Sequence, residues 1–339
     1  MKIPELGIQK PANIVLGAGS SRGASCFENA WVASPLDTDF FEQLERLRNT
    51  PDGKSLEDLV AFARSEFGSN PPRMELFFTQ IESLSEFHQE LNITRGPTIR
   101  QYEKVLERFP SDLATVFRTL RRATNLPELT CSYHEVIAAA LDTSDTIISF
   151  NYDCIFDEAL RSRAGKKWDA ESGYGTPVDQ GADRWHDHTG QGRPAKKTIQ
   201  LLKVHGSLNW NRTTEATVSL RLDPYAKETR HPGEIVAPVW NKRVTGDRVL
   251  SPIWKAARQA LGRGPVLVLI GYSIPDTDLL SQSLLRVATS ESGKKLSHLI
   301  IVNPSPSDRA KTRTVLSKAL TEKTNVIEFS YLHEFIRVL

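Results

Sequence analysis

Short apolar runs recur along the chain, and each of them ends abruptly in small or polar residues. The five clearest runs cover residues 13–16, 146–150, 198–204, 265–270 and 299–302. Runs of this length between turn residues predict buried strands, and the helical spacing of apolar residues after several of them predicts intervening helices. This alternation predicts a doubly wound, mostly parallel, Rossmann-like α/β sheet.

A long stretch between the first two predicted strands has a different pattern. Apolar residues recur every three or four positions over residues 56–141, and the pattern continues past Pro110. This spacing predicts a helical subdomain, inserted at about residues 40–143. Residues 164–197 are polar and without periodicity, which indicates an irregular loop region. We interpret the whole 339-residue chain as a single domain that carries both segments.

The first predicted strand is followed by a turn of small residues: Gly17, Ala18, Gly19, Ser20 and Ser21. Gly17 permits a tight turn, and Gly19 has no Cβ to keep a phosphate away from the backbone. The N–H groups at the start of the next helix would then face the anion. An ordinary strand-to-helix turn is the alternative, because many turns contain two glycines.

Polar or small residues also end the later strands, in the order Asn151, Asp153, His205, Gly271, Ser273 and Asn303. Because ligands of such sheets bind beyond the carboxyl ends of the strands, we expect these residues to line one site. The Asn151 amide can hold a hydroxyl group and face a developing cation. A neutral His205 imidazole can accept a proton near pH 7. Asx turns, a helix cap at Asp153 and a backbone-bonded histidine are the alternatives.

Candidate metal ligands are few. The three cysteines are dispersed and form no Cys-x-x-Cys pair. The segment Trp185–His188 holds two histidines without a further ligand at suitable spacing. Asp276 and Asp278 fit better as an N-cap and a first-turn acid of the helix that follows. We therefore expect no metal.

Charge and hydropathy limit the partners and the cellular location that we expect for the protein. The formal net charge is +2, and no basic stripe with interleaved aromatic residues is present, so we expect no direct nucleic-acid binding. No apolar run approaches the roughly 20 residues of a membrane span. The N-terminus lacks the apolar core of a signal peptide. We expect a cytoplasmic protein without membrane contact.

Five motifs at the strand ends carry a family resemblance. In order they are Gly-Ala-Gly-Ser-Ser (17–21), Phe-Asn-Tyr-Asp (150–153), Lys-Val-His-Gly-Ser-Leu-Asn-Trp (203–210), Gly-Tyr-Ser-Ile-Pro-Asp-Thr-Asp (271–278) and Val-Asn-Pro (302–304). In this order they resemble the sirtuin-like NAD-binding family. The middle three are similar to the bacterial sirtuin-like NADase domains of antiphage defence systems.

This resemblance implies that the chain hydrolyses NAD+ to nicotinamide and ADP-ribose, and that it depletes cellular NAD+ in antiphage defence. It implies that Asn151 and His205 are catalytic and that the first turn holds the diphosphate. It places Ser273 and Asn303 near the adenosine half, whereas Asp153 orients its loop or touches the ribose.

The resemblance also implies control by assembly, either into a homo-oligomer or with a separate partner such as a HerA-type ATPase. A catalytically silent NAD- or ADP-ribose-binding sensor or scaffold is one alternative. An NAD-dependent protein deacylase is another, but the deacylases carry a four-cysteine zinc module that three dispersed cysteines cannot build.

Overall fold

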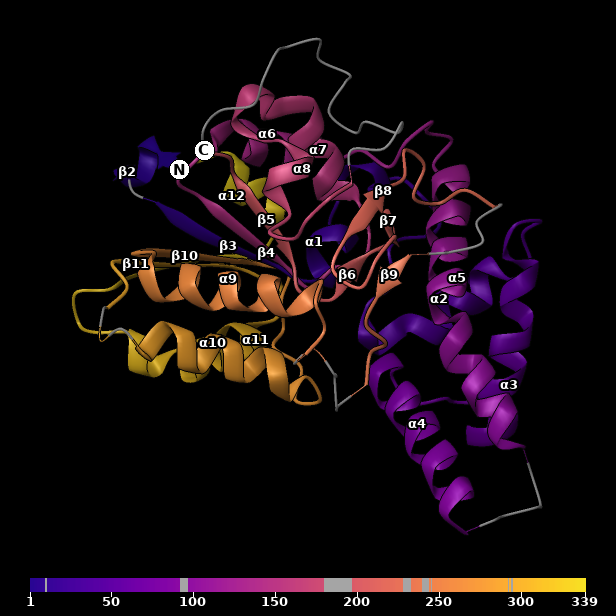
Figure 1. The fold of residues 1–339 in the computed structure, drawn as a ribbon. Coiled ribbons are helices and arrows are strands. Elements are labelled where there is room, and N and C mark those ends of the chain that lie inside the picture. Colours follow the sequence, from indigo (N-terminus) through magenta and orange to yellow (C-terminus); the bar gives the residue numbers. More distant parts are fainter. Residues whose placement is uncertain are drawn as a thin grey trace.

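A six-stranded parallel sheet forms the centre of the computed structural model (Figure 1). Its strand order is β12-β11-β10-β3-β4-β5. The strands are β3 (Ala12–Leu16), β4 (Thr146–Ser149), β5 (Gln200–Lys203), β10 (Val266–Ile270), β11 (His298–Val302) and β12 (Asn325–Phe329). The order reverses between β3 and β10, as in a Rossmann sheet, so the predicted fold class is confirmed.

The structure describes residues 1–9, 11–91, 97–179, 197–227, 233–239, 244, 246–291, 293 and 295–339. A membrane crossing would need a longer or more apolar helix than any in these ranges.

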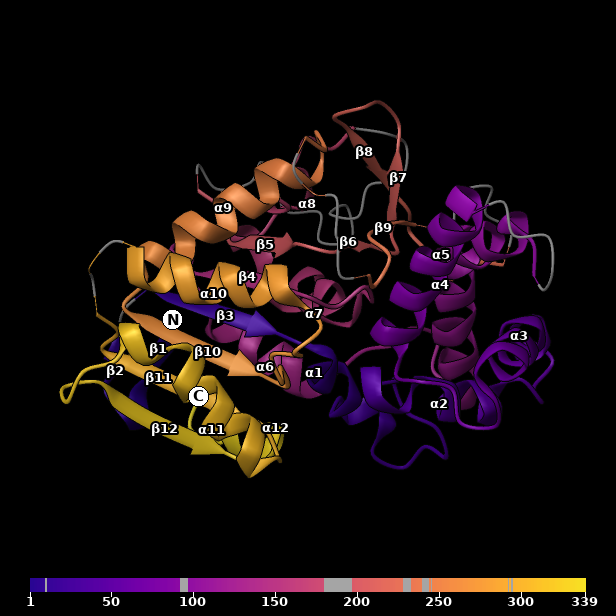
Figure 2. The same ribbon diagram turned by 90° about the horizontal axis from the view of Figure 1, so that it is seen from below.

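Helices cover both faces of the sheet (Figures 1 and 2). One face carries α9 (Leu250–Arg263), α10 (Leu279–Glu291) and α11 (Pro306–Val315). The other carries α6 (Ser132–Ala140), α7 (Ile155–Arg163) and α12 (Leu332–Ile336). Every residue of β3 and β10 is buried, which explains why both strands read as apolar runs.

Four helices stand together beyond the carboxyl ends of the strands (Figure 2). They are α2 (Phe40–Leu47), α3 (Glu57–Phe67), α4 (Met74–Leu91) and α5 (Ile99–Ala123), and we call them the insert. Pro110 lies inside α5. Aromatic rings hold the insert together: the ring centroids of Phe41 and Phe77 lie 4.8 Å apart, and those of Phe78 and Phe109 lie 4.6 Å apart.

Smaller elements surround the carboxyl edge of the sheet and the first strand. They are β1 (Lys2–Ile3), β2 (Ile8–Gln9), α1 (Ala18–Arg22), α8 (Ala170–Gly173), β6 (Gly206–Ser207), β7 (Trp210–Arg212), β8 (Val218–Leu220) and β9 (Glu234–Ile235). The pairs β1-β2, β6-β9 and β7-β8 are antiparallel.

The turns after β3 and β10 pack backbone against backbone. The Gly17 N–H donates to the Ile270 carbonyl at 3.0 Å, and the Gly19 N–H donates to the Gly271 carbonyl at 2.8 Å. A Cβ on Gly17 would lie 2.6 Å from the Gly271 oxygen, and one on Gly19 would lie 2.8 Å from the Gly271 Cα. The sequence predicts that Gly19 lacks a Cβ so that a phosphate can approach, whereas in the fold the neighbouring turn already requires that space.

Gly271 provides the first test of this packing. Its φ is +60°, and an added Cβ would lie 2.1 Å from the Ser20 nitrogen. We expect Gly271→Ala to lower the free energy of unfolding by about 3 kcal/mol or more, because a left-handed residue and a backbone clash add their costs. Urea unfolding followed by circular dichroism measures this loss.

Gly165 is the matched control. It has a similar φ of +55°, but no atom lies within 4 Å of the added Cβ. Gly165→Ala should cost only about 1–2 kcal/mol. Equal losses of unfolding free energy in the two variants would show that the close contact between the turns after β3 and β10 does not add to the cost.

Candidate active site

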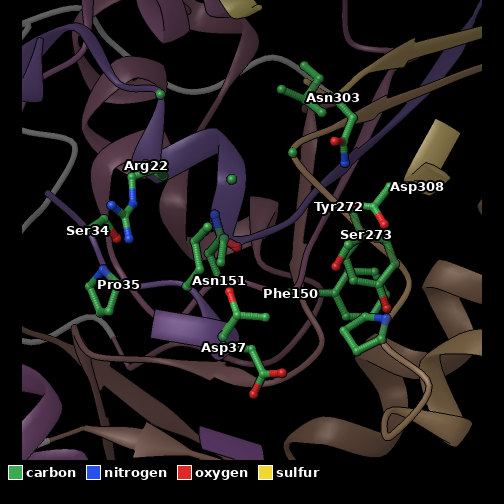
Figure 3. A pocket seen from close by; sticks show the side chains of 18 of the residues that line it. Arg22, Ser34, Pro35, Asp37, Phe150, Asn151, Tyr272, Ser273, Asn303 and Asp308 are labelled. Atoms are coloured by element: carbon green, nitrogen blue, oxygen red, sulfur yellow. The ribbon is translucent and has the colours of Figure 1, made fainter. Parts of the chain in front are cut away.

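A cavity of about 680 Å³ lies at the carboxyl edge of the sheet (Figure 3). This volume is typical of a small-molecule site. The predicted site residues that line it are Ala18, Gly19, Asn151, Asp153, His205, Gly271, Ser273 and Asn303. The insert adds Glu75, Leu113 and Phe117 to its wall. The fold therefore gathers side chains from strand ends that lie far apart in the sequence.

Hydroxyl groups behind the cavity fix the orientation of the Asn151 amide. Its Nδ2 donates to the Ser20 hydroxyl at 3.1 Å and to the Ser21 hydroxyl at 3.0 Å. The Ser20 hydroxyl donates to the Gly17 carbonyl, and the Ser21 hydroxyl donates to the Asp153 carboxylate. Because each hydroxyl has one proton, both can only accept from Asn151. The amide nitrogen therefore faces the serines and its carbonyl oxygen is directed away from them.

The Asn151 Oδ1 is the notable atom of this arrangement. Asn151 is only 8% exposed, and its Oδ1 accepts no hydrogen bond from any described residue. A buried acceptor without a donor costs about 1–3 kcal/mol. Because Asn151 lines the cavity, a hydroxyl group or water bound there is the natural donor, and the negative end of the amide dipole would face a cation.

Asp153 positions the loop that carries Asn151. One carboxylate oxygen accepts from the Ser21 hydroxyl at 2.7 Å, and the other accepts from the Ile155 N–H at 3.0 Å, at the start of α7. The second bond spans two residues and forms an Asx-type turn before α7, whose N-cap is Cys154. Its carboxylate also keeps the Ser21 proton turned away from Asn151.

His205 lies in an aromatic environment at the end of β5. Its ring packs edge-on against Phe150 at 5.3 Å and stacks with Tyr152 at 5.9 Å between centroids. Its Nε2 lies 3.6 Å from the Asp278 Oδ2, and both side chains are buried. The other Asp278 oxygen accepts from the Ser281 N–H at 3.2 Å and so supplies the predicted cap of α10.

The contact between His205 and Asp278 was not predicted from the sequence. His205 follows β5 and Asp278 follows β10, and β3 and β4 stand between these strands. The loop after β10 must cross the ends of both to reach His205. Tyr272 marks its path, because its ring stacks on Phe150 at 4.4 Å.

Two tyrosines form an uncharged wall of the cavity. Burial raises the pKa of Tyr152 well above its ordinary value, and the nearby Glu75 and Asp278 carboxylates add to the effect. Burial and Asp278 likewise raise the pKa of Tyr272. Both phenols therefore remain protonated at neutral pH and do not act as bases.

Ser273 and Asn303 line the part of the cavity beside β10 and β11 (Figure 3). Ser273 is exposed. The Asn303 side-chain oxygen accepts from the Ser305 N–H at 2.9 Å, which is the Asx turn considered as its alternative role. The Gly271 N–H donates to the Val302 carbonyl at 2.8 Å and ties the two turns together.

A fully buried ion pair supports the loop that carries Asn151. The Lys203 Nζ lies 3.0 Å from the Asp157 carboxylate and donates to the Asp153 carbonyl at 2.5 Å. The Tyr174 hydroxyl donates to the other Asp157 oxygen at 2.6 Å. Burial lowers the pKa of Lys203, but the nearby acidic groups, Asp157 first among them, together raise it above its ordinary value. In the sequence, this pair is indicated only by the position of Lys203 inside a predicted apolar strand.

Metal ligands do not gather at this site. Within the described part of the chain, no three His, Cys, Asp or Glu side chains are grouped as a metal ion requires. The segment Trp185–His188 lies outside the described residues.

Comparison with protein families agrees with the four motifs after the first one. A family model described as SIR2-like domain matches residues 145–326, which is more than half of the chain. The matched range contains Asn151, His205, Ser273 and Asn303, and it begins after the glycine-rich turn. No curated protein matches. A solved structure of a Sir2 mutant with a p53 peptide and NAD is 13% identical over 99% of this chain and 96% of that chain, with a TM-score of 0.36.

The buried ion pair yields a stability prediction. Lys203→Met leaves the Asp157 carboxylate buried without its cation, and we expect the free energy of unfolding to fall by about 3–5 kcal/mol. Arg46→Met is the control, because it removes an exposed pair with Glu42 and should cost less than about 1 kcal/mol. Urea unfolding of both variants checks the difference. A loss below about 1 kcal/mol for Lys203→Met would show that the pair does not support the loop.

Proposed function

The chain belongs to the SIR2-like domain family, and on that premise we propose that it hydrolyses NAD+ to nicotinamide and ADP-ribose. The observation that carries the proposal is the fixed Asn151 amide, whose unpaired carbonyl oxygen shares one cavity with His205. Family membership points to NAD-related activity in general. The chemistry of these two side chains favours glycosidic cleavage.

Cleavage of the nicotinamide–ribose bond passes through an oxocarbenium-like ribosyl cation. Nicotinamide leaves as a neutral base, so no strong general acid is needed. The Asn151 Oδ1 would face the cationic ribose or hold one of its hydroxyl groups. His205 would accept the proton of the attacking water as its oxygen bonds to the ribose carbon.

The remaining predicted residues would hold the rest of the substrate. Ala18 and Gly19 line the cavity at the start of α1 and would lie against the diphosphate. Ser273 and Asn303 would contact the adenosine half. Deacylation is less well supported, because the sequence has too few cysteines for the zinc module of sirtuin deacylases.

We extend the proposal to antiphage defence by depletion of cellular NAD+. The support is the resemblance of the motifs at 150–153, 203–210 and 271–278 to bacterial defence domains. Activity would then be controlled by homo-oligomer formation or by a separate partner such as a HerA-type ATPase. Light scattering of the purified protein, alone and with such an ATPase, measures both associations.

Two substitutions test the reaction. We expect the wild-type protein to release nicotinamide and ADP-ribose from NAD+. Asn151→Ala and His205→Ala should each slow this release by about 100-fold or more, because each removes a group that acts in the transition state. Chromatography of the products gives the rates, and calorimetry gives the affinity of each variant for NAD+.

Asn325→Ala and His298→Ala are the matched controls. The two residues are register partners at the amino ends of β12 and β11, at the opposite edge of the sheet, and their loss should leave turnover unchanged. Wild-type rates in Asn151→Ala and His205→Ala would overturn the assignments. NAD+ binding without product, both alone and with the ATPase, would identify a silent binding module instead.

A further inference from the structure

Asp278 is a buried carboxylate that reaches His205 from a distant strand. Its Oδ2 lies 3.6 Å from the His205 Nε2, and the two side chains are 5% and 7% exposed. Low exposure matters here, because a charge pair is weakly screened when water is excluded. The contact therefore has more influence on the imidazole than a surface pair of the same length.

The loop that carries Asp278 is held from several directions. The Asp278 Oδ1 accepts from the Ser281 N–H, and its own N–H donates to the Pro275 carbonyl at 3.2 Å. The neighbouring Thr277 hydroxyl donates to the Glu75 carboxylate of α4. These bonds fix one carboxylate oxygen in the cap of α10 and leave the other directed at His205.

His205 is also restrained on its remaining sides. Phe150 packs against the edge of its ring, Tyr152 stacks on it, and Trp254 lies 6.4 Å away between centroids. Its carbonyl accepts from the Val236 N–H at 2.9 Å. Apolar walls alone would disfavour a charged imidazole, so proton uptake by His205 needs a nearby anion.

We propose that Asp278 is a positioning residue that acts through His205, because its carboxylate, 3.6 Å from the Nε2, stabilises the protonated ring. His205 accepts a proton from the attacking water while the bond to nicotinamide breaks, and it later returns that proton to solvent. The catalytic part of this proposal rests on the proposed function, whereas the pairing of the two side chains does not.

Other ionisable groups surround the pair. Glu75 from α4 and Asp37 from the segment before α2 act electrostatically on Tyr152, as Asp278 does. Arg73 lies 3.6 Å from Asp37 and offsets part of its charge. None of these groups changes in the variants below, so a difference between variants reports on Asp278.

Asp278→Asn is the decisive variant. It keeps an oxygen for the cap of α10, since asparagine is as good an N-cap as aspartate, but it removes the charge. We expect the pKa of His205, followed by histidine NMR, to fall by at least about 1 pH unit, because the anion that favours the imidazolium is gone. The spectrum of His205→Gln assigns the resonance.

Asp247→Asn is the matched control. Asp247 caps the neighbouring α9 through the Val249 and Leu250 N–H groups, each at 2.8 Å, and it does not line the cavity. This variant should leave the titration of His205 unchanged. If Asp278→Asn fails to fold, Asp278→Ser keeps a capping oxygen without the charge, and the same fall is expected.

Turnover gives a second readout. Because the neutral imidazole is the base, the rate rises with pH through the pKa of His205. In Asp278→Asn this acidic limb should move to lower pH, and kcat should fall about 10- to 100-fold while KM for NAD+ changes little. A purely capping role would lower kcat without moving the limb.

The two readouts separate the two proposals. If His205 titrates identically in wild-type protein and in both Asp278 variants, the pairing is overturned, whatever the turnover. If its pKa falls as expected but NAD+ is not cleaved, the pairing stands and the proposed function fails.

Discussion

The close crossing of the turns after β3 and β10 is the constraint on which the site depends. Backbone hydrogen bonds join Gly17 to Ile270 and Gly19 to Gly271, and side chains at these glycines would prevent both bonds. The crossing determines where α1 begins, and therefore where its serine hydroxyls meet Asn151. The glycines thus act on the chemistry indirectly, by placing the groups that orient the amide.

A second set of polar contacts connects the turn after β3 to β5 through Asp153. Asp153 bonds to the first turn through its carboxylate and to Lys203 through its carbonyl. Lys203 lies two residues before His205 on the strand that ends at the cavity. The Asn151 side chain and the end of β5, two residues before His205, are thus joined by one buried network, which replaces water by fixed partners.

The sequence predicted β3 and β10 well because every residue of both strands is buried, and such strands read as apolar runs. It also predicted that Asn151 and His205 line one site, because parallel strands bring their carboxyl ends to one edge, and both residues line the cavity. It could not predict the partner of Lys203 or the contact of Asp278 with His205. Both depend on the course of a loop or helix across neighbouring strands, and residue spacing carries no information on that course. The sequence predicts residues 17–21 to be a phosphate-binding turn. In the fold, Gly17 and Gly19 are also needed for the close contact with the turn after β10.

The insert touches the loop that carries Asn151 and the loop that carries Asp278. Phe109 packs against Tyr152 beside Asn151 at 5.7 Å between centroids, and Glu75 binds Thr277 beside Asp278. A molecule that shifts these contacts on binding to the insert would change the free energy of ligand binding in the cavity. Thermodynamic linkage makes this coupling reciprocal, so the cavity ligand must change the affinity for that molecule by the same factor. Ligand binding in the cavity and binding of such a molecule to the insert would then be linked equilibria.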